Sequence, residues 1–254
     1  MKTLDNKEEK LLYQKTYSIK YYEMDFNQVL KPSALLNFLQ DMATENAQML
    51  GFGASFTFEN NYAWFLVKYH MEFDEYPRAL DEIVIKTEPR GVNKIIANRD
   101  FEIWNSRGNR LGRAASNWTL VDLNTKNILP IAKVIPCMIH FEKRESDMNF
   151  IKITPPEKTE FEKTFEIRFD DIDINRHVNN ANYIVWAFEA LPYDFKAQYR
   201  LKILDIAYKK EIAFGHKVVS CVQISEENGQ KVSLHAVKNA TTQEELCLVK
   251  ALWI

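Results

Sequence analysis

The chain has 254 residues, of which 46% are hydrophobic and 13% aromatic, enough apolar material for one large domain or two of about 125 residues. Its 33 basic and 35 acidic side chains give a net charge of −2, so the charge offers no reason to expect nucleic-acid binding. No apolar run approaches the length that a membrane-spanning helix needs, so we expect no membrane span.

The N-terminus and the cysteines bear on the compartment. The opening MKTLDNKEEK is charged and contains acids, so we expect neither a signal nor a transit peptide. Three cysteines lie far apart with no metal-ligand spacing. These features favour a reduced, cytoplasmic protein.

The first half of the chain predicts one long helix followed by strands. The helix is expected to begin near Pro32 and to end near Gly51, a residue type typical of helix C-caps. One face of it repeats apolar residues at helical spacing: Leu35, Phe38, Leu39 and Met42. Strand composition follows at residues 83–85, 99–104 and 114–122, with turn signals at 106–108 and 122–127.

A charged segment divides the chain. Residues 142–163 are half charged and contain Pro155-Pro156, as expected of an exposed connection. We therefore predict an N-terminal module over 1–141, a linker over 142–164 and a C-terminal module over 165–254. Further strands are expected at 199–208, 217–224, 232–238 and 246–253, with a hairpin turn at 226–229. One helix and several antiparallel strands per module make the predicted fold class α+β.

The most informative stretch is residues 165–189, FEIRFDDIDINRHVNNANYIVWAFE. Phe165, Ile167 and Phe169 alternate with polar residues and predict a half-buried strand. A helical face follows, made of Tyr183, Trp186, Ala187 and Ala190. Between strand and helix lies a polar corner that holds Asp173, Asn175, His177, Asn179 and Asn180.

This corner has two interpretations. Asp and Asn before a helix are commonly caps or Asx turns, and a single His is usually an ordinary loop residue. A helix N-terminus, however, favours developing negative charge, and a His beside a carboxylate could activate water there. Spacing alone does not decide between a structural and a catalytic corner.

The run DIDINRHVNNANYIVW over 171–186 resembles the active-site segment of the acyl-acyl-carrier-protein (acyl-ACP) thioesterases. Their active-site segment pairs with a downstream Tyr-basic-basic-Glu stretch, matched here by Tyr208 to Glu211. Residues 99–103, RDFEI, and 115–118, ASNW, are also similar, and the likeness covers roughly residues 15 to 254.

The resemblance implies two tandem hotdog modules, each a sheet wrapped around a helix, and hydrolysis of fatty acyl-ACP without cofactor or metal. It implies a catalytic set of Asp173, Asn175, His177 and Glu211. Asp173 would orient or deprotonate His177, or itself act as base or nucleophile, and Asn175 would position the substrate carbonyl or the water. Many plant members carry Cys directly after the Glu, where this chain has Ile212, so we expect no catalytic Cys. The acyl chain and the phosphopantetheine arm of the carrier protein are assigned to substrate-binding residues Leu35, Phe38, Leu39, Met42, Asn179 and Asn180.

The two halves of the chain are copies of one module. Residues 17–41, YSIKYYEMDFNQVLKPSALLNFLQD, align without a gap on residues 165–189 at an offset of 148. Asp25 and Asn27 then match Asp173 and Asn175, but Val29 occupies the position of His177. A second alignment places Tyr76 opposite Glu211. It needs about 13 extra residues in the first module, which we assign to the loop 51–60. The functional corner is therefore predicted in the second half only.

Other arrangements are weaker. A metal bound by Asp170, Asp171, Asp173 and His177 lacks a second ligand cluster, and Asp170 and Asp171 are expected to be solvated. No G-x-S-x-G elbow supports a serine hydrolase. The remaining histidines, His70, His140, His216 and His235, are expected to be structural.

Three functions stay open: an acyl-ACP hydrolase, an acyl-CoA hydrolase using the same site, and a non-catalytic acyl-binding module. A basic run could receive an acidic carrier protein or could be a solvated face: Lys196, Arg200, Lys202, Lys209 and Lys210. Chain-length preference and oligomeric state, a homodimer included, are not readable from the sequence.

Overall fold

The computed structural model describes residues 11–78, 80–138 and 140–254, and the chain divides into two compact units. The N-terminal unit contains the chain up to Lys31, Asn37–Val67 and Asp74–Asn149. The C-terminal unit contains Pro32–Leu36, Lys68–Phe73 and Phe150–Ile254.

The first half of the chain forms a helix and an antiparallel sheet. Its elements in chain order are β1 (Tyr13–Ser18), η1 (Tyr21–Glu23), α2 (Pro32–Met49), α3 (Ala54–Asn60), β2 (Tyr62–Phe73), β3 (Glu82–Asn93), β4 (Ile96–Asn105), β5 (Arg110–Asp122) and α4 (Ile131–Val134). The strand order is β1-β3-β4-β5-β2, and β1 pairs with β3 in a register that sets Tyr13 opposite Thr87. Alternating burial along β4 matches a sheet with one face covered.

Helix α2 confirms the predicted bounds. Pro32 stands at its first position, and Gly51 adopts a φ of 85° just beyond its end, the left-handed conformation that glycine accepts most readily. Leu39 and Met42 are fully buried, and the Phe38 ring stacks on Tyr17 of β1 with centroids 4.4 Å apart. The predicted apolar face of the helix is therefore its packed face.

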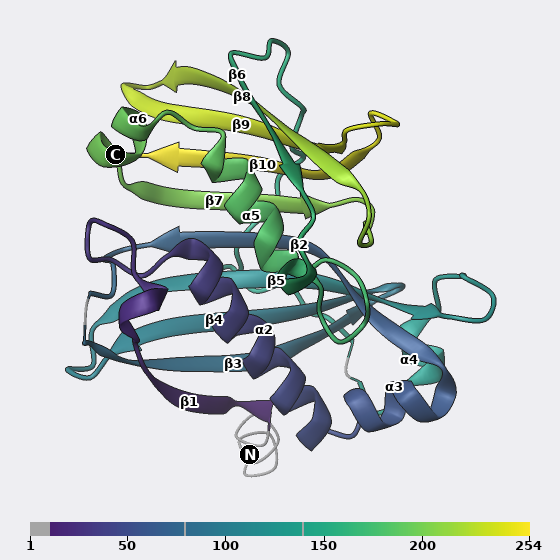
Figure 1. Cartoon of the computed structure of the whole chain (residues 1–254). Coiled ribbons are helices and arrows are strands. Elements are labelled where there is room, and N and C mark those ends of the chain that lie inside the picture. The colour runs from purple at the N-terminus through teal and green to yellow at the C-terminus, as the bar shows by residue number, and fades with distance from the viewer. Residues whose placement is uncertain (1–10, 79, 139) are drawn as a thin grey trace. The chain divides into compact units, whose positions relative to one another are not determined.

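The second half repeats this plan. Its elements are β6 (Phe161–Glu166), η2 (Phe169–Asp171), α5 (Asn180–Glu189), α6 (Tyr193–Gln198), β7 (Leu201–Tyr208), β8 (Lys217–Glu227), β9 (Gln230–Asn239) and β10 (Glu245–Trp253). The order is β7-β10-β9-β8-β6, and the Lys68–Phe73 part of β2 pairs antiparallel with β7. Helix α5 lies across β8, β9 and β10 (Figure 1), with the Trp186 ring stacked on Phe165 of β6 at 6.4 Å. Each half is thus a sheet wrapped around a helix, and the α+β hotdog prediction is confirmed.

The two copies differ in length where the prediction placed a loop. Helix α2 has 18 residues and α5 has 10, while β2 has 12 residues and β7 has 8. The segment 51–60 contains the short helix α3 and is not simply an inserted loop. Most of the extra residues of the first copy therefore lengthen the helix and the strand. Strand β2 itself is absent from the sequence prediction.

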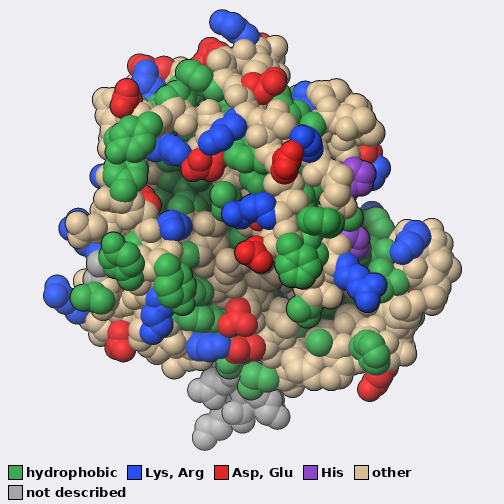
Figure 2. All heavy atoms as spheres, viewed as in Figure 1, with side chains coloured by type: hydrophobic (Ala, Val, Ile, Leu, Met, Phe, Trp, Pro, Cys, Tyr) green, Lys and Arg blue, Asp and Glu red, His purple; other side chains and the backbone are tan. Residues whose placement is uncertain are grey.

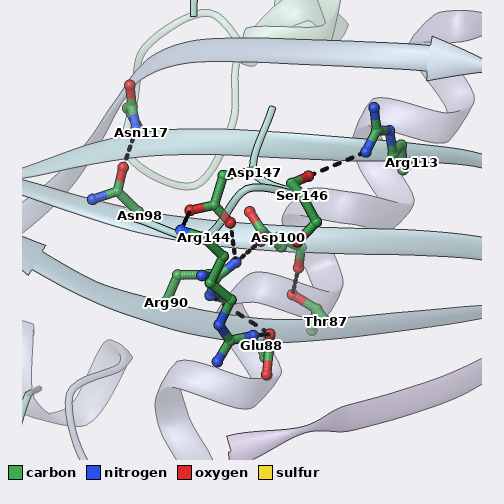
Figure 3. A network of polar contacts seen from close by, with 10 residues as sticks. All are labelled: Thr87, Glu88, Arg90, Asn98, Asp100, Arg113, Asn117, Arg144, Ser146 and Asp147. Carbon is green, nitrogen blue, oxygen red and sulfur yellow. Dashed lines mark hydrogen bonds and ion pairs between the residues drawn. The ribbon is translucent and has the colours of Figure 1, made fainter. Parts of the chain in front are cut away.

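The predicted linker carries buried side chains. Asp147 bonds to the guanidinium of Arg90, a buried residue of β3, at 2.6 Å, and Arg90 also pairs with Asp100 of β4 (Figure 3). The Asp147 carboxylate additionally accepts the Arg144 backbone N–H at 2.7 Å, which closes a turn. Further along, Ile153 is buried against Ala236 and Leu248. Asp147 is thus held by residues of the N-terminal unit and Ile153 by residues of the C-terminal unit. Strand β6 begins at Phe161, earlier than predicted.

Two of the histidines expected to be structural, His70 and His235, have polar side chains within bonding distance. His70 on β2 lies 2.6 Å from Asp205 of β7 and 3.2 Å from Glu72. Burial lowers the pKa of His70, but the two carboxylates outweigh it, and the net shift is upward.

His235 on β9 is completely buried. Its Nδ1–H donates to the Ala187 carbonyl of α5 at 2.9 Å, because a carbonyl can only accept. Its Nε2 therefore accepts from Ser233, whose hydroxyl in turn accepts the Trp253 indole N–H at 2.8 Å. Burial lowers the pKa of His235 to about 3.

Candidate active site

The polar corner of the second half is a tight turn between η2 and α5. The Asp173 N–H donates to the His177 carbonyl at 2.8 Å, and the Arg176 N–H donates back to the Asp173 carbonyl at 3.0 Å. Arg176 adopts a left-handed φ of 65°, which closes the turn. The Val178 N–H then donates to the carbonyl of Ile212 at 3.1 Å. These bonds bring the corner beside the segment that follows β7, although 34 residues separate Val178 from Ile212.

The corner thereby places His177 next to Glu211. The His177 Nδ1 lies 3.2 Å from Glu211 Oε2. Both side chains are partly open to solvent, at 42% and 44% exposure, so a substrate can reach them. The second carboxylate of the predicted set thus contacts the imidazole directly.

The Asp173 carboxylate bonds to Asn175. Its Oδ1 accepts the Asn175 backbone N–H at 2.8 Å, and its Oδ2 lies 3.4 Å from the Asn175 Nδ2. The carboxylate therefore forms an Asx turn and faces the carboxamide of Asn175. From the sequence we expected Asp173 to orient or deprotonate His177, or to act as base or nucleophile; the contacts that the structure describes for its carboxylate are instead with Asn175, a role that was not predicted.

Two residues assigned to the substrate contribute to the start of α5. The Asn179 side chain accepts the Ala181 N–H at 2.9 Å as the helix N-cap, and the Asn180 carbonyl accepts the Tyr208 hydroxyl at 3.2 Å. Their assignment to substrate contact stays a prediction. So does the assignment of Leu35, Phe38, Leu39 and Met42 to an acyl pocket, since their packing in α2 is what the structure describes.

Two expectations at this corner are wrong. Phe169 is not a strand residue but begins η2, with 81% of its surface exposed. Asp171 is not solvated but buried, and pairs with Arg168 at 2.7 Å. The Arg168 backbone N–H also donates to Asp171 at 2.8 Å, and this capping arrangement turns the chain before the predicted strand can reach Phe169.

The first half of the chain contains the equivalent turn at residues 25–29, which we call the first corner. Its backbone follows the same path as that of the second corner, residues 173–177. Its Asp25 N–H donates to the Val29 carbonyl at 2.9 Å, the Gln28 N–H donates to the Asp25 carbonyl at 3.0 Å, and Gln28 has a φ of 61°. The Asp25 carboxylate accepts the backbone N–H groups of Asn27, at 2.8 Å, and of Val29, at 3.2 Å. Each of the backbone bonds has its counterpart 148 residues later, which confirms the predicted repeat.

The alignment of Tyr76 with Glu211 is also supported by the structure. The Leu30 N–H donates to the Pro77 carbonyl at 3.0 Å, as the Val178 N–H does to Ile212. Pro77 therefore corresponds to Ile212, and Tyr76 to Glu211. The first corner keeps the turn and replaces both the imidazole and the carboxylate.

The cysteines and the basic run do not add a reactive group. Cys221 and Cys247 are buried, and burial raises the pKa of both thiols, while Cys137 is exposed in the N-terminal unit. Lysines of the basic run are paired with acids: Lys196 with Glu189, Lys209 with Glu245 and Lys210 with Glu244. Basic and acidic side chains are likewise interspersed on the face of the molecule that Figure 2 shows.

Comparison with known proteins assigns both halves to one family. The family model of the acyl-ACP thioesterase N-terminal domain matches residues 10–137, and that of the C-terminal domain matches residues 154–254. The chain belongs to the acyl-ACP thioesterase family. The family resemblance is thereby confirmed over both modules.

Curated members of the acyl-ACP thioesterase family align with most of the chain. The chloroplastic oleoyl-acyl carrier protein thioesterase 2 of Arabidopsis thaliana is 24% identical over 249 residues, covering 91% of this chain and 67% of the relative. The chloroplastic palmitoyl-acyl carrier protein thioesterase of Gossypium hirsutum is 26% identical over 232 residues, covering 86% and 56%. The chain thus spans between about half and two thirds of these plant proteins.

Solved structures extend the likeness to the fold. An acyl-ACP thioesterase from Bacteroides thetaiotaomicron is 27% identical with a TM-score of 0.84, covering 97% of this chain and 99% of that one. The 12:0-ACP thioesterase from Umbellularia californica is 18% identical with a TM-score of 0.84, covering 96% and 94%. Among the described residues of the present chain, no helix is long and apolar enough to cross a bilayer.

Proposed function

We propose that this member of the acyl-ACP thioesterase family hydrolyses fatty acyl-ACP by His-assisted attack of water, without a catalytic cysteine. The observation that carries the mechanism is the 3.2 Å contact between His177 Nδ1 and Glu211 Oε2. A carboxylate that accepts Nδ1–H fixes the tautomer of the imidazole and leaves Nε2 as an acceptor for a proton from water. Glu211 would also stabilise the imidazolium that forms when His177 takes that proton.

Asn175 is the group best suited to the thioester carbonyl. Its carboxamide is oriented by Asp173 and can donate a hydrogen bond to the oxygen as negative charge develops there. The N-terminal end of α5 adds a favourable dipole at this corner. Asp173 thus acts on the oxyanion side of the reaction and Glu211 on the proton-transfer side.

The step balances with water as the second reactant. The water oxygen bonds to the carbonyl carbon while its proton passes to His177 Nε2. The C–S bond then breaks, and the carboxylic acid and the thiolate of the phosphopantetheine arm separate. The thiolate takes the proton back from the imidazolium. Its conjugate thiol has a pKa of about 8.5, so the departure needs little acid assistance.

Position 212 supports a reaction without cysteine. Ile212 is buried and follows Glu211 directly, and it carries no nucleophile. The next cysteine along the chain, Cys221, lies in β8 and is buried. The reduced state of Cys137, Cys221 and Cys247 is also consistent with a cytoplasmic setting, which we propose as the compartment.

The test compares His177→Ala with the matched control His216→Ala, a substitution of an exposed histidine in the same unit. Thiol release is measured on acyl-ACP and on acyl-CoA of one chain length. We expect His177→Ala to lower kcat by at least about 10²-fold with an unchanged melting temperature, and His216→Ala to leave kcat unchanged. Full turnover in a folded His177→Ala protein would contradict the site.

The same assay separates the alternatives. Faster turnover of acyl-ACP supports the proposal, while faster turnover of acyl-CoA supports a coenzyme A thioesterase that uses the same corner. Binding of acyl-ACP without any turnover by the wild-type protein would indicate a non-catalytic acyl-binding module.

A further inference from the structure

Two tyrosine hydroxyls at the second corner bond to the backbone on either side of the catalytic pair. Tyr183, in the first turn of α5, is buried, and its hydroxyl donates to the Lys210 carbonyl over a long 3.5 Å. Lys210 is the residue directly before Glu211. One side chain of the helix therefore binds the peptide group that precedes the carboxylate.

Tyr208 makes the reverse connection. It is the last residue of β7, and its hydroxyl donates to the carbonyl of Asn180, the first residue of α5, at 3.2 Å. The rings of Tyr183 and Tyr208 meet edge to face with centroids 5.8 Å apart, which restricts both side chains. The helix thus bonds to the Glu211 segment, and the strand that leads to Glu211 bonds to the helix.

The repeat shows that this pair of hydroxyls is not needed to form the corner. The offset of 148 residues places Leu35 at the position of Tyr183, and the alignment of Pro77 with Ile212 places Phe73 at that of Tyr208. The first corner nevertheless forms the same backbone bonds, including that of Leu30 to Pro77. The hydroxyls are present in the copy that has His177 and Glu211 and absent from the copy that has neither.

We propose that Tyr183 and Tyr208 are positioning residues that hold Glu211 at its bonding distance from His177. This inference rests on the proposed function, because its consequence is a rate. Without the hydroxyls the turn would persist, as in the first corner, but the 208–212 segment would lose its bonds to α5. A displacement of about 1 Å in such a contact is enough to cost up to about 10²-fold in rate.

The Tyr183 hydroxyl keeps its proton at neutral pH. Burial raises the pKa of Tyr183 well above its ordinary value, and the nearby Cys247, Glu211 and Asp173 raise it further. A protonated hydroxyl can donate to the Lys210 carbonyl, as this arrangement requires.

The experiment removes one hydroxyl and keeps the ring. Tyr183→Phe is compared with Tyr193→Phe, which removes an exposed hydroxyl from α6 in the same unit. We expect Tyr183→Phe to lower kcat about 10- to 100-fold with KM nearly unchanged, because the substrate contacts are kept. In a Glu211→Gln background the same substitution should cost nothing further, because its effect passes through Glu211. Tyr193→Phe should match the wild type.

Amide hydrogen exchange gives a readout that does not depend on turnover. The Val178 amide, which donates to the Ile212 carbonyl, should exchange faster in Tyr183→Phe than in the wild type, because the segment that carries its acceptor is held less firmly. Wild-type kcat in Tyr183→Phe, an equal loss in the Glu211→Gln background, or unchanged Val178 exchange would each overturn the inference. Absence of turnover in the wild-type protein would instead overturn the proposed function, and faster Val178 exchange would still show that the hydroxyl holds the segment.

Discussion

The repeat makes a quantitative prediction about its two corners. Asp25 and Asp173 are equivalent carboxylates that each accept the N–H of the residue two positions later at 2.8 Å. Replacing either by Asn keeps an acceptor oxygen and the shape of the side chain while it removes the charge. We expect both variants to fold, with small losses of stability, but only Asp173→Asn to lose activity.

The expected size of each effect follows from the contacts. Asp25 accepts two backbone N–H groups and therefore acts like a helix-capping side chain, so its complete removal in Asp25→Ala should cost about 1–2 kcal/mol. For a protein of this length that corresponds to a fall of about 2–8 °C in melting temperature. Val29 and Tyr76 take the places of the imidazole and the carboxylate that form the proton-transfer pair of the second corner, so kcat should not change.

At the second corner we expect the equivalent substitution to lower kcat. Asp173→Asn would present an amide where the Asn175 carboxamide now meets a carboxylate, so the carboxamide loses its orientation. A loss of at least about 10²-fold in kcat is expected, the size associated with an oxyanion-side donor. Asn175→Ala and Asn27→Ala form a second matched pair with the same expectation.

Melting temperature and single-turnover rate, measured for all variants, decide the question. Equal kinetic losses at Asp25 and Asp173 would refute the reasoning, because both corners would then contribute to the chemistry. An unchanged rate in Asp173→Asn would refute the role assigned to that carboxylate.

Two further predictions concern thiols and pH. Iodoacetamide should label Cys137 and leave turnover unchanged, because burial raises the pKa of the Cys221 and Cys247 thiols and shields them; complete inactivation that disappears when one cysteine is substituted would contradict this. His235 has a pKa of about 3 in the folded protein and about 6.5 when unfolded, so the unfolded state binds an extra proton as pH falls from 6.5 towards 3, and folding weakens across that window. Between pH 7 and 5 this should cost about 2 kcal/mol in urea unfolding, and His235→Gln should show a flatter pH dependence; an identical slope in both proteins would rule out His235 as the source.

The sequence predicts those parts of the fold that local patterns encode. The apolar period of α2, its Pro32 start and its Gly51 end are local signals, and the 148-residue offset identifies the second corner from the first. Strand β2 escaped prediction because YAWFLVKYHMEF has no clear alternation, and its buried residues in the structure are not confined to one face. A strand without alternation cannot be separated from other apolar runs by periodicity.

The site was predictable only in part. Spacing identified the polar corner, but the pairing of His177 with Glu211 joins residues 34 positions apart and entered through the family resemblance. The burial of Asp171 depends on a bond to Arg168 that charge patterning does not reveal. The tyrosine pair had a usable signal, since Leu35 and Phe73 stand at its positions in the first copy, and that difference gains meaning only once the hydroxyl contacts are known.

The contacts of the segment after β5 have a consequence for recombining family members. Arg90 binds Asp147 in the N-terminal unit, whereas Ile153 packs against strands of the C-terminal unit. In a chimaera that takes residues up to 141 from this chain and the rest from another family member, Arg90 would lose its own Asp147. The buried guanidinium would then face whatever residue the other protein has at that position. A crossover between Asn149 and Phe150 keeps each half of the segment with the unit it contacts, so this peptide bond is preferred over 141 as a junction, although the Lys68–Phe73 part of β2 would then pair with a β7 from the other parent.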